Sequence, residues 1–288
     1  MLKCTVRGRV VKSDNGDTSS VKVGDDVIVQ PLSSTEGIIR KILPRRSKLS
    51  RAVEEKAYRE HIVAVNIDQM VIIMSTKQPA FKSGLLDRYL VIAEKNKLKS
   101  IICLNKIDLI DKSKFEDTIS QYQKLNYPFH CTSVVTGEGM ELFKSFLVDK
   151  VSVLVGHSGV GKSSMIQKIE PSIDLKIMEV SQKTNKGKHS TTHVELFPLS
   201  FGGYIIDTPG IRELGLWDIY RNELKNYFIE FGKYEIFCQF NNCNHYKEPG
   251  CAIKQAVEQG EISAERYKNY CHIYEDLRTA PYELIKRR

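Results

Sequence analysis

The sequence contains no apolar run of about 18 residues, which is the length that a membrane-spanning helix requires. Its first residues, MLKCTVRGRVVKSDNG, lack the apolar core of a secretory signal peptide. These two absences leave no recognisable signal for membrane insertion or export in the sequence. We therefore expect a cytoplasmic protein with no membrane partner.

Cysteine is scarce: the chain has seven, an odd number, and three of them lie close together near the C-terminus. Without an export signal, such a cluster favours a metal site over disulfides. The other four cysteines lie in apolar or helical contexts, and we expect them to be unreactive core residues. They are Cys4, Cys103, Cys131 and Cys271.

No charge of either sign dominates the chain. Its 288 residues are 41% hydrophobic and 27% charged, as in ordinary soluble proteins, and this length predicts two or three domains. The net charge of +8 is concentrated at one end: residues 1–60 hold 13 Lys/Arg against 8 Asp/Glu, whereas residues 216–288 hold 11 of each. A basic N-terminal end fits a polyanionic partner, and a solvated basic face without a partner fits equally well.

Residues 1–60 contain short β-branched segments separated by turn residues: VRGRVVK, VKVGDDVIVQ and EGIIRKILP. Several short strands without a covering helix predict a small β-barrel of the OB type. Such barrels bind single-stranded nucleic acid, although this one could also serve only as a spacer. The basic run Arg45–Arg51 closes the region, either as a phosphate contact or as a solvated linker.

Residues 61–215 alternate between apolar strand patterns and segments with helical spacing. Alternation of this kind predicts a parallel sheet that is covered by helices on both faces, with ligand-binding loops at the carboxyl ends of its strands.

The apolar run Val151–Val155 predicts a buried strand, and it leads directly into the complete pattern G-x-x-x-x-G-K-[ST]. Glycines let the backbone wrap around phosphate oxygens, Lys162 reaches the β- and γ-phosphates, and Ser163 is a ligand for Mg²⁺. We expect Lys162 and Ser163 to be catalytic. The residues assigned to this nucleotide phosphate site are Gly156, His157, Ser158, Gly159, Val160, Gly161, Lys162, Ser163 and Ser164.

The tetrapeptide Asn105-Lys106-Ile107-Asp108 follows the predicted strand KSIICL. A carboxylate at Asp108 accepts hydrogen bonds from N1–H and the exocyclic amine of guanine, a donor pair that adenine lacks, so the tetrapeptide favours GTP over ATP. Alone, it also fits a polar turn, and an unrelated P-loop ATPase is then the alternative. Ser133 ends the next predicted strand, where backbone amides can support the guanine O6.

Residues that sense the γ-phosphate are predicted after the strand GYIID. Asp207 places a carboxylate near Mg²⁺, and Gly210 offers an N–H to the γ-phosphate; both are expected to be catalytic. The polar segment 181–193 has three lysines and predicts a mobile loop that supplies either Thr191 or Thr192. Ile211 stands where many GTPases carry a glutamine that orients water, which predicts slow intrinsic hydrolysis.

Four potential metal ligands follow the pattern Cys238-x4-Cys243-x-His245-x5-Cys251. Three thiolates and an imidazole suit tetrahedral Zn²⁺, and four protein ligands predict one closed, structural site. Residues 255–288 have helical character and end in Lys286-Arg287-Arg288, a potential phosphate contact.

The motif order is unusual, because the guanine tetrapeptide precedes the phosphate loop. This order resembles the circularly permuted GTPases, and with a β-barrel before it and a Cys/His cluster after it the chain is most similar to the RsgA (YjeQ) family. The resemblance implies Mg²⁺-dependent hydrolysis of GTP to GDP, stimulated by the 30S subunit, in late maturation of the small ribosomal subunit. It also implies binding of 16S rRNA through the barrel and the zinc domain, and its loop pattern favours Thr192 as the switch threonine.

The sequence thus predicts an α/β fold with three domains: an OB-like barrel (1–60), a circularly permuted P-loop GTPase domain (61–215) and a helical zinc-binding domain (216–288), active as a monomer. An RNA-binding assembly factor that GTP switches, with incidental hydrolysis, is the alternative. Because the loop after Asp207 leads into the zinc domain, we also expect bound nucleotide to reposition that domain.

Overall fold

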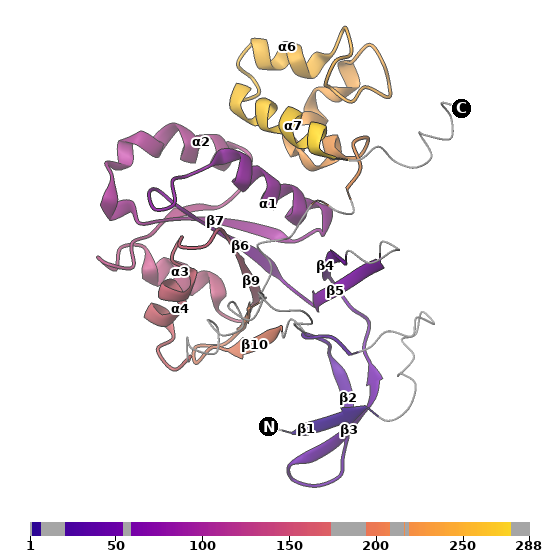
Figure 1. Cartoon of the computed structure of the whole chain (residues 1–288), viewed down its shortest axis with the longest axis vertical. Helices are drawn as coiled ribbons and strands as arrows, with labels where there is room; N and C mark the ends of the chain where they lie inside the picture. The colour runs from indigo at the N-terminus through magenta and orange to yellow at the C-terminus, as the bar shows by residue number, and fades with distance from the viewer. Residues whose placement is uncertain are drawn as a thin grey trace.

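The computed structural model describes residues 2–6, 21–53, 59–173, 194–207, 216 and 219–277. Figure 1 shows three groups of elements: small β-sheets near the N-terminus, a central sheet with helices, and a helical group near the C-terminus. The predictions for Thr191, Thr192, Gly210 and Ile211 concern residues outside the described ranges. Within those ranges, no helix has the length and apolar character needed to cross a membrane.

The central sheet has six strands in the order β10, β11, β9, β6, β7, β8. Their bounds are β6 (Gln69–Ser75), β7 (Lys99–Asn105), β8 (Phe129–Cys131), β9 (Val151–Val155), β10 (Glu195–Pro198) and β11 (Tyr204–Asp207). Neighbouring strands are parallel except for β10, which pairs antiparallel with β11. The predicted parallel sheet is confirmed, and the carboxyl ends of its five parallel strands share one edge.

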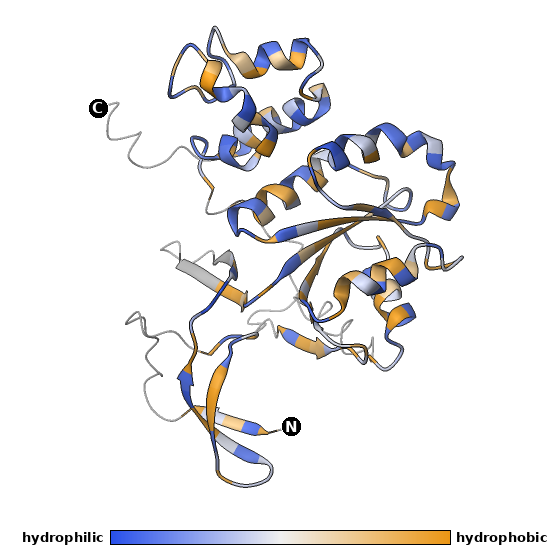
Figure 2. Ribbon diagram, turned by 180° about the vertical axis from the view of Figure 1, so that it is seen from behind, coloured by the Kyte–Doolittle hydropathy of each residue, from blue (hydrophilic) through white to orange (hydrophobic). Residues whose placement is uncertain are grey.

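Helices cover both faces of this sheet (Figure 1). Helices α1 (Ser83–Lys95) and α2 (Glu116–Lys124) pack on one face, and α3 (Met140–Leu147) and α4 (Lys162–Ile169) pack on the other. Strand β6 shows why. Met70, Ile72 and Met74 belong to the first core, whereas Val71 and Ile73 belong to the second, since successive side chains of a strand point to opposite faces. The middle parts of the central strands are accordingly hydrophobic, with polar residues at the strand ends (Figure 2).

The N-terminal region is built from β-strands, as predicted. Strands β1 (Lys3–Val6), β3 (Glu36–Ile42) and β2 (Val27–Pro31) form a sheet in that order, and β4 (Lys48–Val53) pairs antiparallel with β5 (Arg59–Val65). An isolated bridge between Val23 and Ala64 joins the two parts. Because the described strands form two separate sheets, closure into an OB-like barrel stays a prediction.

The basic run Arg45–Arg51 is partly a connection and partly a strand: residues 45–47 link β3 to β4, and β4 begins at Lys48. The side chain of Arg45 donates to both carboxylate oxygens of Asp25, at 2.7 and 2.8 Å, and the Asp25 side chain is almost fully buried. Leu49 has no exposed surface and anchors β4 in the core. Charge in this run therefore concealed the start of a strand.

The C-terminal region consists of short helical turns followed by two helices. They are η5 (Leu224–Tyr227), η6 (Ile229–Lys233), η7 (Glu235–Phe237), α6 (Ala252–Glu258) and α7 (Ala264–Asp276). Its core is aromatic: the rings of Phe228 and Phe231 lie 5.1 and 4.9 Å from that of Tyr270. The predicted helical stretch from residue 255 is interrupted at Gly260, whose φ of +76° ends α6.

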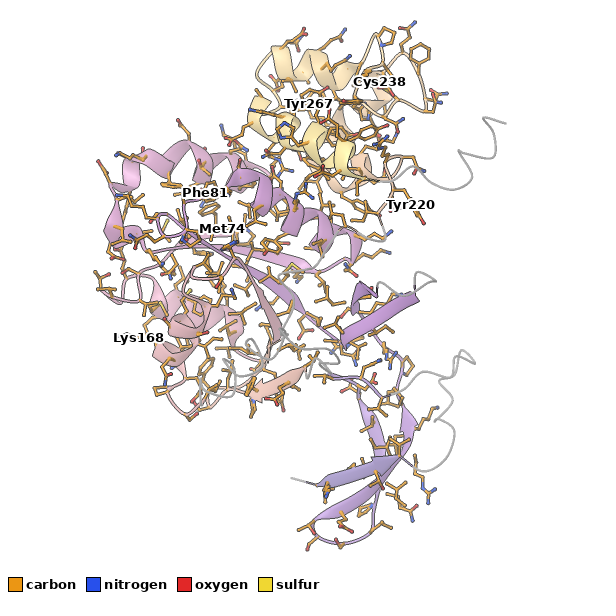
Figure 3. All side chains as sticks on the ribbon, in the orientation of Figure 1. Met74, Phe81, Lys168, Tyr220, Cys238 and Tyr267 are labelled. Carbon is orange, nitrogen blue, oxygen red and sulfur yellow. The ribbon has the colours of Figure 1, made fainter. Side chains whose placement is uncertain are left out.

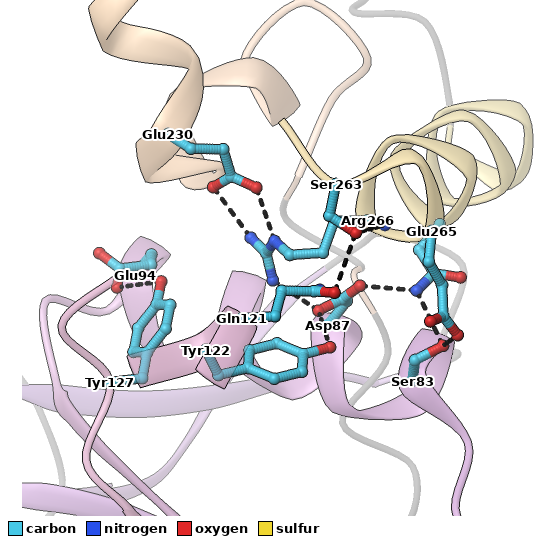
Figure 4. Close-up of polar contacts among 11 residues, drawn as sticks. Ser83, Asp87, Glu94, Gln121, Tyr122, Tyr127, Glu230, Ser263, Glu265 and Arg266 are labelled. Atoms are coloured by element: carbon cyan, nitrogen blue, oxygen red, sulfur yellow. Dashed lines mark hydrogen bonds and ion pairs between the residues drawn. The ribbon is translucent and has the colours of Figure 1, made fainter. Parts of the chain in front are cut away.

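Helix α7 packs on α1 through a buried polar group that we call the Arg266 cluster (Figure 4). The Arg266 guanidinium, 2% exposed, donates to Asp87 and Glu230, both at 2.6 Å. Asn269 and Tyr122 also donate to Asp87, at 2.7 and 2.9 Å. Burial raises the pKa of Asp87, although Arg266 and these hydrogen bonds oppose the rise.

This cluster bears on the expectation that bound nucleotide repositions the C-terminal region. The region is tied to α1 by buried charges as well as by the chain that follows β11. A repositioning would therefore have to carry α1 along or break the Arg266 cluster.

Candidate nucleotide and metal sites

The predicted phosphate loop connects β9 to α4. Gly156 follows β9 directly with φ +147°, and a Cβ there would lie 2.1 Å from the carbonyl oxygen of Ile73, so only glycine fits. Lys162 begins α4, and its ammonium donates to the carbonyls of Gly156 (2.7 Å) and His157 (3.0 Å). The lysine thus closes the loop on itself, at the helix N-terminus where an anion is favoured.

The guanine tetrapeptide is bonded to this loop, although 55 positions separate the two in the chain. The Asn105 side chain ends β7, is 1% exposed, and donates to the carbonyl of Val160 at 2.9 Å. A Cβ at position 161 would lie 2.4 Å from the Asn105 amide nitrogen, and Gly161 also has φ +102°. The last glycine of the phosphate loop, Gly161, is therefore needed for the contact with Asn105.

Lys106 makes a second bridge between the two segments. Its ammonium donates to the carbonyl of Gly159 at 2.7 Å and to that of Gln78. Its backbone is left-handed, with φ +63°. The side chains of Asn105 and Lys106, two residues of the tetrapeptide predicted to bind guanine, thus both contact the phosphate loop.

Asp108 is the exposed residue of the tetrapeptide, within the short helix η1 (Ile107–Leu109). Ser133, which is fully buried, donates from its hydroxyl to the Asp108 carboxylate at 2.6 Å and accepts from the N–H of Thr136. The loops after β7 and β8 are therefore joined at the carboxylate that is predicted to meet guanine. The adjoining segment η2 (Lys112–Phe115) carries Lys112, which pairs with Glu138 across the same loops.

The predicted switch residues are placed only in part. Asp207 ends β11, one strand away from β9 and at the same edge of the sheet as the phosphate loop. Gly210 and Thr192 lie outside the described residues.

The structure also brings together the four residues of the Cys/His pattern. One ligand atom from each of Cys238, Cys243, His245 and Cys251 lies within 4.8 Å of all the others. The Nδ1 atom of His245 is 3.5 Å from the Sγ atoms of both Cys238 and Cys251. Three sulfurs and one nitrogen at this spacing fit tetrahedral zinc. Figure 3 shows Cys238 in the C-terminal region with Tyr267 of α7.

The loop around these ligands is held by α7 and by Glu248. Tyr267 donates to the carbonyl of His245 at 2.8 Å, and Tyr270 donates to that of Asn244. The Glu248 carboxylate accepts from the backbone N–H groups of residues 244, 246 and 247, at 3.0 to 3.1 Å. These contacts fix the loop but leave the ligand atoms facing one another.

The imidazole of His245 is neutral, which is the form in which histidine binds a metal. Burial raises the pKa of the Cys243 thiol to about 12, and burial together with Lys225 lowers the pKa of His245 to about 4. Without a cation, the thiol is neutral at physiological pH and the imidazole is uncharged. A bound divalent cation reverses this for a thiol, because it stabilises the thiolate.

A protein-family model described as RsgA GTPase matches residues 42–217 of this chain. A protein of Caldanaerobacter subterraneus subsp. tengcongensis named small ribosomal subunit biogenesis GTPase RsgA is 41% identical over 278 residues, covering 96% of this chain and 89% of that protein. The chain belongs to the RsgA GTPase family. A second relative with this name, from Chlorobaculum tepidum, is 42% identical over 285 residues, with 96% of this chain and 91% of that protein covered.

Two solved structures of similar proteins agree with this RsgA-family assignment. YjeQ from Thermotoga maritima has a TM-score of 0.78 at 36% identity, covering 99% of this chain and 90% of that one. YloQ, described as a circularly permuted GTPase, has a TM-score of 0.71 at 31% identity, covering 100% and 87%. The predicted fold class is thereby confirmed, and the chain is a GTPase of the RsgA family.

Sequence reasoning about this RsgA-family chain missed the residues that support its motifs. Thr132 donates from its hydroxyl to the Asn105 side chain at 3.3 Å, and the carbonyl of Gln78 receives the Lys106 ammonium. A single hydroxyl or a backbone carbonyl has no pattern in sequence, so no signal along the chain identifies these contacts.

Proposed function

We propose that this GTPase binds GTP and GDP where the loops after β7, β8 and β9 meet, and hydrolyses GTP to GDP and phosphate with Mg²⁺. The observation that carries the proposal is the pair of bridges from Asn105 and Lys106 to the phosphate loop. Two motifs with separate chemistry, one for phosphate and one for guanine, support each other at a single edge of the sheet.

Each side chain has a proposed role. The Lys162 ammonium exchanges its hydrogen bonds to the carbonyls of its own loop for contacts with the β- and γ-phosphates. The Ser163 hydroxyl is a ligand for Mg²⁺, which neutralises phosphate charge. The Asp108 carboxylate accepts from guanine while Ser133 holds it in place. Asp207, Gly210 and Thr192 complete the γ-phosphate end of the site; this part of the proposal depends on their places in the sequence.

We further propose that the protein assists late maturation of the 30S subunit in the cytoplasm as a monomer and contacts 16S rRNA. Support comes from the relatives, which are named small ribosomal subunit biogenesis GTPases. This chain matches them over nearly their whole length. The basic N-terminal end supplies charge that suits rRNA phosphates. The proposed divisions are residues 1–60 for RNA binding, 61–215 for GTP and 216–288 for zinc.

For the metal, we propose one structural Zn²⁺ held by Cys238, Cys243, His245 and Cys251. All four positions of a tetrahedral ion would be filled by the protein, so the ion holds the fold and leaves no open position for substrate.

A second candidate function has one observation in its favour. Ile211 cannot hydrogen-bond to water, so hydrolysis could be incidental in a GTP-switched RNA-binding factor. The two candidates differ in turnover on the ribosome.

Steady-state GTP hydrolysis with and without purified 30S subunits separates them. We expect stimulation by at least about tenfold that is lost in Lys162→Ala. GTP-dependent 30S binding without stimulation would favour the second candidate, and no binding at all would contradict both.

A further inference from the structure

The segment between β6 and α1 belongs to none of the nucleotide-binding motifs, yet it contacts the guanine tetrapeptide at Asn105 and Lys106. We call residues 75–79 the Ser75–Pro79 turn. The hydroxyl of Ser75, 1% exposed, donates to the carbonyl of Pro79 at 2.6 Å and so closes the turn on itself. The closed turn presents the carbonyl of Gln78 to the ammonium of Lys106.

Thr76 lies inside this turn and holds the backbone of the guanine tetrapeptide. Its hydroxyl donates to the carbonyl of Lys106 at 2.6 Å, and its N–H donates to the carbonyl of Asn105 at 3.1 Å. Thr76 is only 5% exposed, so water does not readily replace the hydroxyl contact. The Lys106 carbonyl also accepts from the N–H of Leu109, at 3.1 Å.

The position of Lys106 needs such support. A lysine with φ +63° is in a left-handed conformation that a side chain with a Cβ rarely adopts without compensating contacts. In this conformation its ammonium reaches Gly159 of the phosphate loop, and Asp108 follows two residues later in η1. The turn thus holds Lys106 at both ends: Thr76 contacts its carbonyl, and Gln78 accepts from its ammonium.

We infer that Thr76 is a positioning residue for guanine recognition, acting through the backbone of Lys106 to orient Asp108. The inference deepens the proposed function and rests on it. Loss of the hydroxyl releases one contact on the tetrapeptide and leaves Lys162 and Ser163 of the phosphate loop in place. Guanine affinity therefore depends on the hydroxyl more than phosphate affinity does.

The test is Thr76→Val, which keeps the side-chain shape and removes the hydroxyl. GDP and ADP affinities are measured by displacement of a fluorescent GDP from the full-length protein. We expect the Kd of GDP to rise about tenfold, as for the loss of one buried hydrogen bond, while the Kd of ADP changes less than about threefold. Thr76→Ser restores the hydroxyl and should restore GDP affinity. A general loss of structure would weaken both nucleotides alike.

Ser100→Ala is the matched control. Ser100 lies on the neighbouring strand β7, and its buried hydroxyl has no hydrogen-bond partner among the described residues, so the change should leave both affinities as they are. If Thr76→Val does not fold, Thr76→Ala replaces it with the same expected change in the GDP to ADP ratio.

The outcomes separate the inference from the proposed function. Unchanged GDP affinity in the folded variant, or an equal rise for GDP and ADP, overturns the positioning role alone. Failure of the unsubstituted protein to bind GDP overturns the nucleotide site as well.

Discussion

Lys106 in the proposed nucleotide site and His245 in the proposed zinc site both have left-handed backbones, with φ +63° and +58°, but different contacts hold them. Around Lys106, hydroxyls, amides and an ammonium are satisfied by carbonyls on loops that a six-stranded sheet supports. Around His245, one ring nitrogen and the three thiols lie within 4.8 Å of one another, and Nδ1 is 3.5 Å from two of the sulfurs.

This difference indicates which of the two sites the protein can hold together without a bound metal. The loops of the nucleotide region are held by the protein's own hydrogen bonds and stand on two apolar cores. The zinc loop has a smaller aromatic core beneath it and polar contacts around its rim. We therefore expect the nucleotide region to keep its fold without metal and the zinc region to depend on metal.

The largest expected effect comes from Cys243→Ser, which removes one of the four proposed zinc ligands. Bound zinc should fall to well below half an equivalent, and the C-terminal region should lose on the order of several kcal/mol of stability, because metal binding is coupled to folding. Nucleotide affinity should persist, since the sheet does not use the metal. Metal analysis and GDP titration on one preparation measure both quantities.

Cys271→Ser controls for the loss of any cysteine from the same region. Cys271 is half-buried on α7, outside the cluster of ligands, and its replacement should leave zinc content unchanged. Full zinc retention in Cys243→Ser would contradict the assignment of that ligand.

A smaller effect is expected where the two regions meet. Arg266→Met leaves the carboxylates of Asp87 and Glu230 close together without their cation, and breaking a buried pair in this way costs roughly 3–5 kcal/mol. The C-terminal region should then separate from α1 and become more sensitive to protease. Denaturant unfolding and limited proteolysis measure the two consequences.

The same interface offers a matched control in Arg88→Met. Arg88 pairs with Asp276 at the exposed edge of the contact, and an exposed pair contributes at most about 1 kcal/mol. An equal loss of unfolding free energy in the two variants would mean that burial of the Arg266 cluster is not what joins the regions.

The sequence predicted most of the features that follow a local pattern. The strand and glycine pattern from Val151 to Ser163, the tetrapeptide after β7 and the Cys/His spacing each occupy one short segment, and the structure brings the residues of each together as expected. A site whose chemistry requires residues at a fixed spacing can be recognised as a motif in a single sequence.

Contacts between segments that are distant in the chain have no such motif. Asp87 and Arg266 are separated by 179 positions, and nothing in either neighbourhood indicates the other. Thr76 supports Lys106 from a strand end with no motif of its own. The strand β4 was missed because its basic residues outweighed the buried Leu49 as a signal. These features depend on how the strands and helices are arranged, which one-dimensional patterns do not record.

The central claim is that the phosphate loop and the tetrapeptide form one guanine-specific site, and Asp108→Asn tests it most directly. In the variant, the amide nitrogen of asparagine replaces one carboxylate oxygen of Asp108. This nitrogen is a donor and cannot accept a hydrogen bond from the guanine donors. We expect the Kd of GDP to rise by at least about a hundredfold. Xanthosine diphosphate, which carries a carbonyl in place of the exocyclic amine, should bind the variant better than it binds the unsubstituted protein.

Asp111→Asn is the control, because this exposed carboxylate lies three residues further on and caps the N–H of Ser113 at 3.1 Å, a role that asparagine also fills. A weakened GDP affinity with a gain for xanthosine diphosphate, confined to Asp108→Asn, is the predicted result. An unchanged preference for GDP in Asp108→Asn would mean that this carboxylate does not read the base, and it would contradict the account.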